Sequence, residues 1–220
     1  MKISQSLLNM QPSATRAVDE KAKDLKNKGV PVVSLSGGVP GFRSPSASLR
    51  YAERAMREGK TFYTATAGIA ELRSAVSDYY NERFGLKYGT DQIVIGAGAK
   101  PLIFEALGAI IDPGDEVILI APSWVSYVEQ IRFFGGKPVI VGTKNRTFEI
   151  DIDRLHAAIN DKTVSIVINY PNNPTGVICD QRTMEDLCHL AMEKNIHIIN
   201  DEIYERITLS LIHISEPTRR

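Results

Sequence analysis

The fold class is decided by the stretch VSIVINYPNNPTG at residues 164–176. Its first five residues are almost all apolar, and the polar, proline-rich part that follows cannot continue a strand. A second run of the same kind, VILI, stands at residues 117–120. Strands that read as continuous apolar runs are buried on both faces, as in a largely parallel sheet covered by helices. The sequence therefore predicts an α/β protein, a three-layer sandwich around a mostly parallel sheet.

Helical segments and short apolar strands alternate from Ser46 onward. We expect helices over residues 48–58, 69–84, 101–111, 124–134, 153–159 and 182–194, and strands over 93–95, 116–121, 138–141, 164–169 and 197–200. Before Ser46 the sequence predicts a helix over 16–28 and a strand-like run at Val32, Val33 and Leu35.

These patterns divide the chain into three parts. Residues 1–45 are expected to be an N-terminal arm with part of a small domain, and residues 46–208 a large domain that is incomplete. Residues 209–220 resemble a conceptual translation of a sequencing adapter, so we expect this tail to be an artefact outside the fold.

The composition excludes several function classes. The 26 basic and 26 acidic residues cancel, so no basic excess indicates nucleic acid or an anionic membrane as a partner. Two cysteines, Cys179 and Cys188, are too few for a disulfide scaffold and are expected to be free thiols. With no export signal and no apolar stretch of about 20 residues, we expect a soluble cytoplasmic protein. No metal site is predicted.

A glycine-rich loop, GAGAK at residues 96–100, follows a predicted strand and opens a predicted helix. Unpaired N–H groups and the positive end of the helix dipole favour phosphate there, and small residues let the anion approach the backbone. A plain strand-to-helix turn is the alternative. A dinucleotide fingerprint is disfavoured, because Pro101 takes the place of its third glycine and Asp115 lies in a turn before a strand.

Three further motifs stand at strand ends, where open α/β sheets bind ligands. In PSWVSY at 122–127, Trp124 can stack on an aromatic ring or simply cap the core. In NYPNNPTG at 169–176, Asn173 offers a donor and an acceptor, and its bond to Pro174 is a candidate for the cis state. In NDEIY at 200–204, Asp201 is either a surface acid or a carboxylate that keeps a pyridine nitrogen protonated.

Taken together, these motifs resemble the class I and II aminotransferases, most closely those of the bacterial aspartate type. Six strings carry the resemblance in the family's order: QPSAT at 11–15, AGIAELR at 67–73, DPGDEV at 112–117, WVSY at 124–127, PNNPTG at 171–176 and DEIY at 201–204. The resemblance implies the large domain of a fold type I transferase that depends on pyridoxal 5'-phosphate. It implies a transaminase of amino-acid metabolism that moves an amino group from aspartate or a similar amino acid to a 2-oxo acid.

The resemblance also assigns roles to single residues. Gly98, Ala99 and Lys100 hold the cofactor phosphate, Trp124 stacks on the ring, Asn173 and Tyr204 bind its phenolic oxygen, and Asp201 pairs with its ring nitrogen. The substrate is assigned to Gly38, Trp124 and Asn173. Tyr63 matches a tyrosine that reaches the neighbouring subunit's phosphate, which implies a homodimer with shared active sites.

Two departures from the family pattern limit these assignments. Val39 and Gly41 stand where the family usually has acids, which leaves the substrate preference open. The family's Schiff-base lysine lies downstream of the DEIY motif, so we expect no catalytic lysine within the 220 residues, which by themselves are expected to be inactive. Lys100 does not take that role. A lyase or synthase of the same fold and a non-catalytic binding protein are the alternatives.

Overall fold

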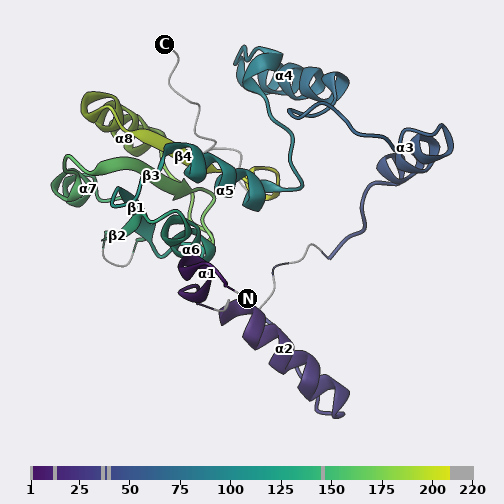
Figure 1. The fold of residues 1–220 in the computed structure, drawn as a ribbon, viewed down its shortest axis with the longest axis horizontal. Helices are drawn as coiled ribbons and strands as arrows, with labels where there is room; N and C mark the ends of the chain where they lie inside the picture. Colours follow the sequence, from purple (N-terminus) through teal and green to yellow (C-terminus); the bar gives the residue numbers. More distant parts are fainter. Residues whose placement is uncertain (1, 12–13, 36–37, 39–40, 145–146, 209–220) are drawn as a thin grey trace. The chain divides into compact units, whose positions relative to one another are not determined.

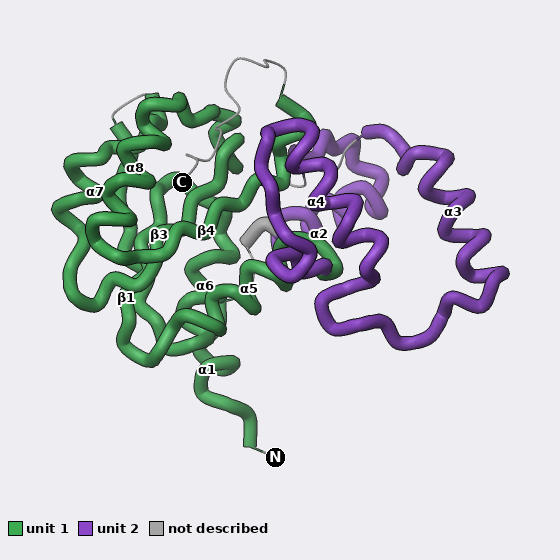
Figure 2. Tube along the Cα trace, turned by 90° about the horizontal axis from the view of Figure 1, so that it is seen from above, with its two compact units in different colours: residues 1–11, 96–220 green, residues 12–95 purple. Residues whose placement is uncertain are grey.

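The structure is a computed structural model that describes residues 2–11, 14–35, 38, 41–144 and 147–208. The chain divides into two compact units, residues 1–11 with 96–220 and residues 12–95 (Figure 2). The domain boundary expected at residue 45 lies inside the second unit, and the division predicted from the sequence stays a prediction. The tail at 209–220 and Val39 lie outside the described residues.

A four-stranded parallel sheet forms the centre of the first unit (Figure 1). Its strands, in the spatial order β2-β1-β3-β4, are β1 (Glu116–Ala121), β2 (Lys137–Gly142), β3 (Thr163–Asn169) and β4 (His197–Asp201). The two apolar runs that decided the fold class occupy the central strands β1 and β3, which are covered on both faces. The predicted parallel sheet is therefore confirmed.

Helices cover both faces of this sheet. On one face, Val117 and Leu119 of β1 pack in a cluster with α5 (Ala99–Ile110) and α6 (Ser126–Phe133). On the other, Ile118 and Ile120 pack in a cluster with α7 (Ile152–Ala158) and α8 (Gln181–Lys194). The alternation along β1 follows from the two-residue repeat of a strand. It produces the three layers expected from the sequence.

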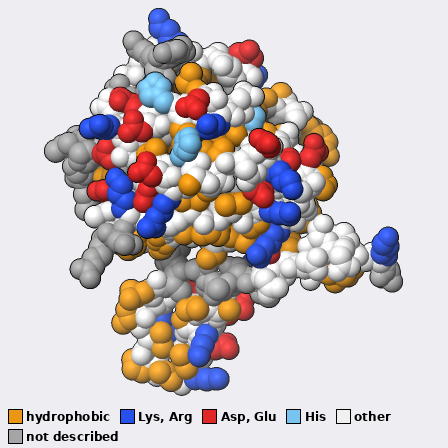
Figure 3. All heavy atoms as spheres, turned by 90° about the vertical axis from the view of Figure 1, so that its left-hand side faces the viewer, with side chains coloured by type: hydrophobic (Ala, Val, Ile, Leu, Met, Phe, Trp, Pro, Cys, Tyr) orange, Lys and Arg blue, Asp and Glu red, His pale blue; other side chains and the backbone are white. Residues whose placement is uncertain are grey.

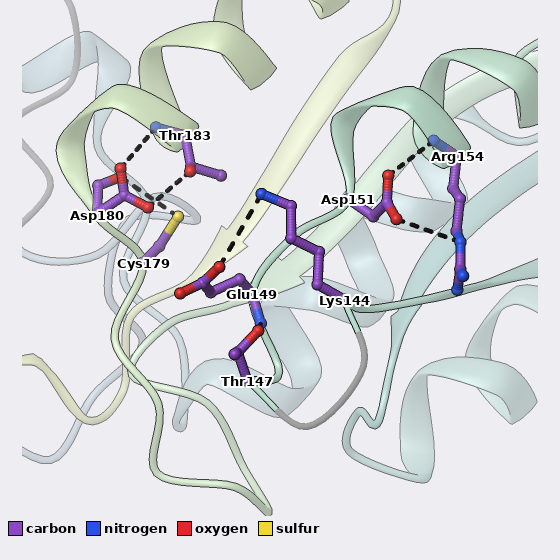
Figure 4. Close-up of polar contacts among 8 residues, drawn as sticks. All are labelled: Lys144, Thr147, Glu149, Asp151, Arg154, Cys179, Asp180 and Thr183. Atoms are coloured by element: carbon purple, nitrogen blue, oxygen red, sulfur yellow. Dashed lines mark hydrogen bonds and ion pairs between the residues drawn. The ribbon is translucent and has the colours of Figure 1, made fainter.

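Aspartates begin both helices of the second face (Figure 4). Asp151 Oδ1 accepts a hydrogen bond from the N–H of Arg154 at 3.1 Å, and Asp180 Oδ1 accepts one from the N–H of Thr183 at 2.9 Å. N-cap carboxylates satisfy N–H groups that a helix leaves unpaired. Each aspartate thus satisfies one N–H in the first turn of its helix.

Both cysteines are free thiols, as predicted. Cys179 is buried, and its Sγ donates to the carbonyl oxygen of Asp180 at 3.5 Å (Figure 4). Burial is the main reason that the pKa of Cys179 rises to about 12. The thiolate, which is the reactive form, is therefore disfavoured at this position.

A short N-terminal helix, α1 (Gln5–Leu8), belongs to the same unit as the sheet. The N–H of Gln11, just after it, donates to Glu129 Oε2 on α6 at 2.9 Å. A single turn of 3₁₀ helix, η2 (Glu205–Ile207), follows β4.

The second unit consists of helices. They are α2 (Ala14–Asn27), α3 (Ser46–Arg57), α4 (Ala70–Phe84) and the 3₁₀ turn η1 (Thr90–Gln92). Tyr80 packs edge to face against Tyr79 and Tyr88, which fixes the return of the chain after α4.

Two strands expected in this unit are absent from its described residues. Residues 93–95 form no strand there, and the N–H of Ile95 donates to Ala67 O at 3.0 Å. Val33 and Leu35 leave 87% and 94% of their surface exposed. An apolar run becomes a strand only when a neighbouring strand takes up its hydrogen bonds. These two predictions were wrong for that reason.

The surface is mixed in charge. On the face drawn in Figure 3, acidic and basic side chains are interspersed rather than gathered by sign. Among the described residues, none of the helices combines the length and apolar character that a membrane crossing needs.

Candidate active site

Polar residues collect where β1, β3 and β4 end. Trp124 follows β1, Asn173 lies in the loop after β3, and Asp201 is the last residue of β4. Because the strands are parallel and adjacent, their carboxyl ends meet at one edge of the sheet. Helix α5 also belongs to this unit and has contacts with β4.

The carboxylate of Asp201 is held inside the protein by two donors. Only 7% of Asp201 is exposed, and Oδ2 accepts a hydrogen bond from the hydroxyl of Tyr127 at 2.7 Å. Its other oxygen accepts one from the N–H of Ile203 at 3.1 Å. Hydrogen bonds to the charged form stabilise a buried carboxylate. Asp201 is thus a structured buried acid and not the surface acid that was the alternative.

No role was assigned to Tyr127 from the sequence. Burial, followed by the hydrogen bond to Asp201, raises the pKa of Tyr127 well above its ordinary range. The hydroxyl therefore keeps its proton and stays a donor. The only sequence signal was its place three residues after Trp124, one helical turn along the same string.

Asn169, the last residue of β3, was also missed, although it begins the predicted motif. Its Nδ2 donates to the carbonyl oxygen of Asp201 at 2.7 Å, and its Oδ1 accepts from the N–H of Asn173 at 2.8 Å. Asn173 in turn donates from Nδ2 to the hydroxyl oxygen of Tyr204 at 2.8 Å. Hydrogen bonds therefore connect the end of β3, the loop that follows it and the end of β4.

The loop after β3 is also tied to β1. Nδ2 of Asn172 donates to Pro122 O at 3.2 Å, and Oδ1 of Asn172 accepts from the N–H and the hydroxyl of Thr175. The Asn173–Pro174 bond is cis, the state for which the sequence made it a candidate. The loop thus holds Asn173 in place from both sides.

Trp124 presents an aromatic ring at the same edge. Its ring meets that of Tyr127 edge to face, with centroids 5.3 Å apart. Nζ of Lys100 lies 5.2 Å from the Trp124 centroid, within cation–π range. The ring is partly buried and packs against the core cluster formed by β1, α5 and α6, so the alternative that Trp124 caps the core agrees with the structure as well.

The first turn of α5 supplies an anion-binding group. Gly98 caps the helix with φ 101° and ψ 168°, a conformation essentially restricted to glycine, and it has no side chain to cap the helix. Within the described part of the chain, the N–H groups of Ala99 and Lys100 have no acceptor. In α7 and α8 an aspartate accepts from the N–H of the third helical residue, whereas the third residue of α5 is Pro101, which has no N–H to cap.

Comparison with known proteins identifies the family. The sequence profile described as "Aminotransferase class I and II" matches residues 30–215. The chain belongs to this family. The chain is similar to the aspartate/prephenate aminotransferase of Thermus thermophilus, with 40% identity over 97% of this chain and 56% of that protein. It is 40% identical to the aspartate aminotransferase of Bacillus subtilis, over 94% and 53% of the two chains.

The fold agrees with this family. The aspartate aminotransferase of Thermus thermophilus solved with maleate superposes with a TM-score of 0.94 and 40% identity, covering 98% of this chain and 57% of that one. The chain therefore spans about half the length of the relatives it matches, and its sheet corresponds to part of the aminotransferase large domain.

Aminotransferases of this family depend on pyridoxal phosphate, and the donors described above suit its chemical groups. The unpaired N–H groups of α5 beside Lys100 suit a phosphate, and a flat ring such as Trp124 suits a pyridine. A buried carboxylate such as Asp201 suits a protonated ring nitrogen.

The two remaining predicted residues lie in the other unit. Gly38 is exposed, and the side chain of Tyr63, between α3 and α4, is fully exposed. Gly41 is exposed as well. The roles assigned to Gly38 and Tyr63 in the substrate pocket and across a dimer interface stay predictions.

Proposed function

We propose that the protein to which these residues belong is a pyridoxal-phosphate-dependent transaminase that moves the amino group of aspartate or a similar amino acid to a 2-oxo acid. The observation that carries this proposal is the buried Asp201 carboxylate, held by Tyr127 at the carboxyl end of β4. The two donors stabilise this buried acid in part, and a cationic ligand group that pairs with it would offset the remaining cost of burial.

In the proposed site, each described residue binds one part of the cofactor. The N–H groups of Ala99 and Lys100 bind the phosphate, and Gly98 has no side chain that would cap them. Trp124 lies against the ring, and the linked pair Asn173 and Tyr204 donates to the phenolic oxygen. When bound, the cofactor supplies an aldehyde that takes up the amino group and a ring that withdraws electrons from the reacting carbon.

Asp201 holds the proton on the ring nitrogen. Tyr127 and Ile203 donate to its carboxylate and fix its orientation, and little water competes at a side chain that is 7% exposed. A fixed negative charge in a poorly hydrated site is worth more than the same charge in water. Asn169 keeps Asp201 in line with the loop that carries Asn173.

The substrate part of the proposal draws on a solved relative, and the assembly part draws on the family resemblance. The solved relative from Thermus thermophilus contains maleate, a dicarboxylate, which favours an acidic amino acid such as aspartate as donor. A homodimer that shares Tyr63 across its interface, a substrate pocket lined by Gly38 and a cytoplasmic location complete the proposal. A lyase of the same fold remains the second candidate.

The test is to sequence the source gene through its stop codon, express that whole protein and supply aspartate with 2-oxoglutarate. A transaminase forms glutamate, and Asp201→Ala lowers the rate at least about a hundredfold, since the ring nitrogen loses its charged partner. The control Asp153→Asn, at an exposed position, leaves the rate unchanged. Consumption of the amino acid without glutamate indicates a lyase. No reaction and no cofactor binding contradicts the proposal.

A further inference from the structure

Helix α6 carries two buried polar side chains one turn apart. Tyr127 is 1% exposed and Gln130 is 6% exposed, and the third buried residue of the helix is Ile131. Residues three apart lie on the same face of a helix. One face of α6 therefore presents both polar groups to the elements beside it.

The two groups contact different ends of the proposed site. Tyr127 donates to Asp201, which faces the ring nitrogen in the proposed function. Gln130 donates from Nε2 to the carbonyl oxygen of Lys100 at 3.0 Å, in the first turn of α5. The N–H of Lys100 is one of the two N–H groups of that turn without an acceptor. The hydrogen bond from Gln130 to the carbonyl of Lys100 therefore restrains the direction in which these two N–H groups point.

Packing alone does not explain a glutamine at this position. The Oε1 atom of Gln130 is buried and has no hydrogen-bond partner among the described residues. Leaving a buried amide oxygen unpaired is unfavourable, and methionine would fill a similar volume without that penalty. The hydrogen bond that Nε2 of Gln130 donates to α5 explains why an amide stands at this position.

We propose that Gln130 is a positioning residue that fixes the first turn of α5 against α6 and so sets the phosphate end of the cofactor site. The proposal rests on the proposed function. Tyr127, on the same face of α6, serves the ring end. One helix thus aligns both ends of the ligand through two separate hydrogen bonds.

The test uses two ligands to distinguish the phosphate end of the proposed site from its ring end. Pyridoxamine 5'-phosphate and pyridoxamine differ only in the phosphate, and neither has an aldehyde to react with surface lysines. Trp124 is the only tryptophan, so quenching of its fluorescence reports binding at this site. The ratio of the two affinities, measured on the 220-residue chain, is the contribution of the phosphate.

Gln130→Met and Gln130→Leu are expected to weaken the phosphorylated ligand about tenfold, the loss expected for one hydrogen bond, and to leave pyridoxamine unchanged. Their affinity ratio therefore falls about tenfold. Tyr127→Phe is the matched control on the same face of α6. It weakens both ligands by the same factor and keeps the ratio.

Two results overturn the inference. The first is an equal loss of both ligands in the Gln130 variants, which indicates a general structural role. The second is an unchanged ratio in variants that fold with the wild-type melting temperature. If the wild-type chain binds neither ligand, or binds both equally, these residues do not form the proposed phosphate site, and the inference fails. The transaminase activity of the longer protein is tested separately by glutamate formation.

Discussion

The hydroxyl of Tyr127 donates to Oδ2 of Asp201 over 2.7 Å, and both side chains are buried. Because the acceptor is poorly hydrated, removing this donor leaves the buried carboxylate with the N–H of Ile203 as its remaining donor among the described residues. Tyr127→Phe is expected to lower the free energy of unfolding by about 1.5 to 3 kcal/mol. Urea denaturation measures this loss.

The interaction itself is isolated by a double-mutant cycle with Asp201→Asn. We expect the two losses to be strongly non-additive, since either change removes the same bond. Tyr51→Phe, at a tyrosine that is 62% exposed, serves as the control and should change stability by less than about 0.5 kcal/mol. Strict additivity of Tyr127→Phe and Asp201→Asn would contradict the described bond.

Asn169 is expected to stabilise the site as a whole. Asn169→Ala removes two bonds of a side chain that is 4% exposed, leaving Asp201 O and the Asn173 N–H without this partner. We expect a loss of about 2 to 4 kcal/mol in unfolding free energy.

Asn160 provides the matched control for Asn169. It also makes two side-chain hydrogen bonds, with Glu116 and with the N–H of Lys162, but it is exposed, so water can replace them. Asn160→Ala should therefore cost clearly less, below about 1 kcal/mol. Equal losses at the two positions would show that burial at Asn169 is unimportant.

Gly98 is required by its backbone conformation. A methyl group at Gly98 would meet no atom within 4 Å, so Gly98→Ala tests conformation alone. At φ 101° we expect it to cost about 1 to 3 kcal/mol, and to weaken phosphate-bearing ligands more than pyridoxamine. Gly142→Ala, at the end of β2, is the control and should be nearly neutral. A Gly98→Ala protein as stable as wild type argues against the described helix start.

Glu202 makes stability depend on pH. Burial, followed by the charges of Glu205 and Asp201, raises its pKa above the ordinary 4.5. The folded protein then binds this proton more tightly than the unfolded chain, so the contribution of Glu202 to stability declines as pH rises from 4.5 through the raised pKa. Glu202→Gln stays neutral, keeps a partner for Nδ2 of Asn200, and removes the decline.

The measurement for Glu202 is a series of denaturation curves from about pH 4 to about pH 8. The stability of Glu202→Gln relative to wild type should increase across this range. A difference that does not vary with pH would mean that the folded and unfolded states bind the proton equally.

Much of the fold was predictable because burial leaves a strong pattern in the sequence. The apolar runs at 117–120 and 164–168 identified the central strands, and turn residues set the helix limits to within a few positions. The runs at 32–35 and 93–95 misled for the same reason, since apolar composition does not reveal whether a partner strand is present.

The site was predictable where a motif concentrates unusual residues, as at Asn173 and Asp201. Asn169, Tyr127 and Gln130 act through hydrogen bonds to residues between 4 and 74 positions away, and their residue types are common. Only the packing of α6 on the sheet brings Tyr127 to Asp201. Such roles depend on tertiary structure and leave no local signal.

The central claim is that these residues form a binding site for pyridoxal phosphate, and a titration of Trp124 fluorescence with pyridoxamine 5'-phosphate tests it most directly. The account predicts saturable quenching in the wild-type chain and at least about tenfold weaker binding in Asp201→Ala, which lacks the partner of the ring nitrogen. Quenching that does not saturate, or that is identical in Asp201→Ala, would contradict it.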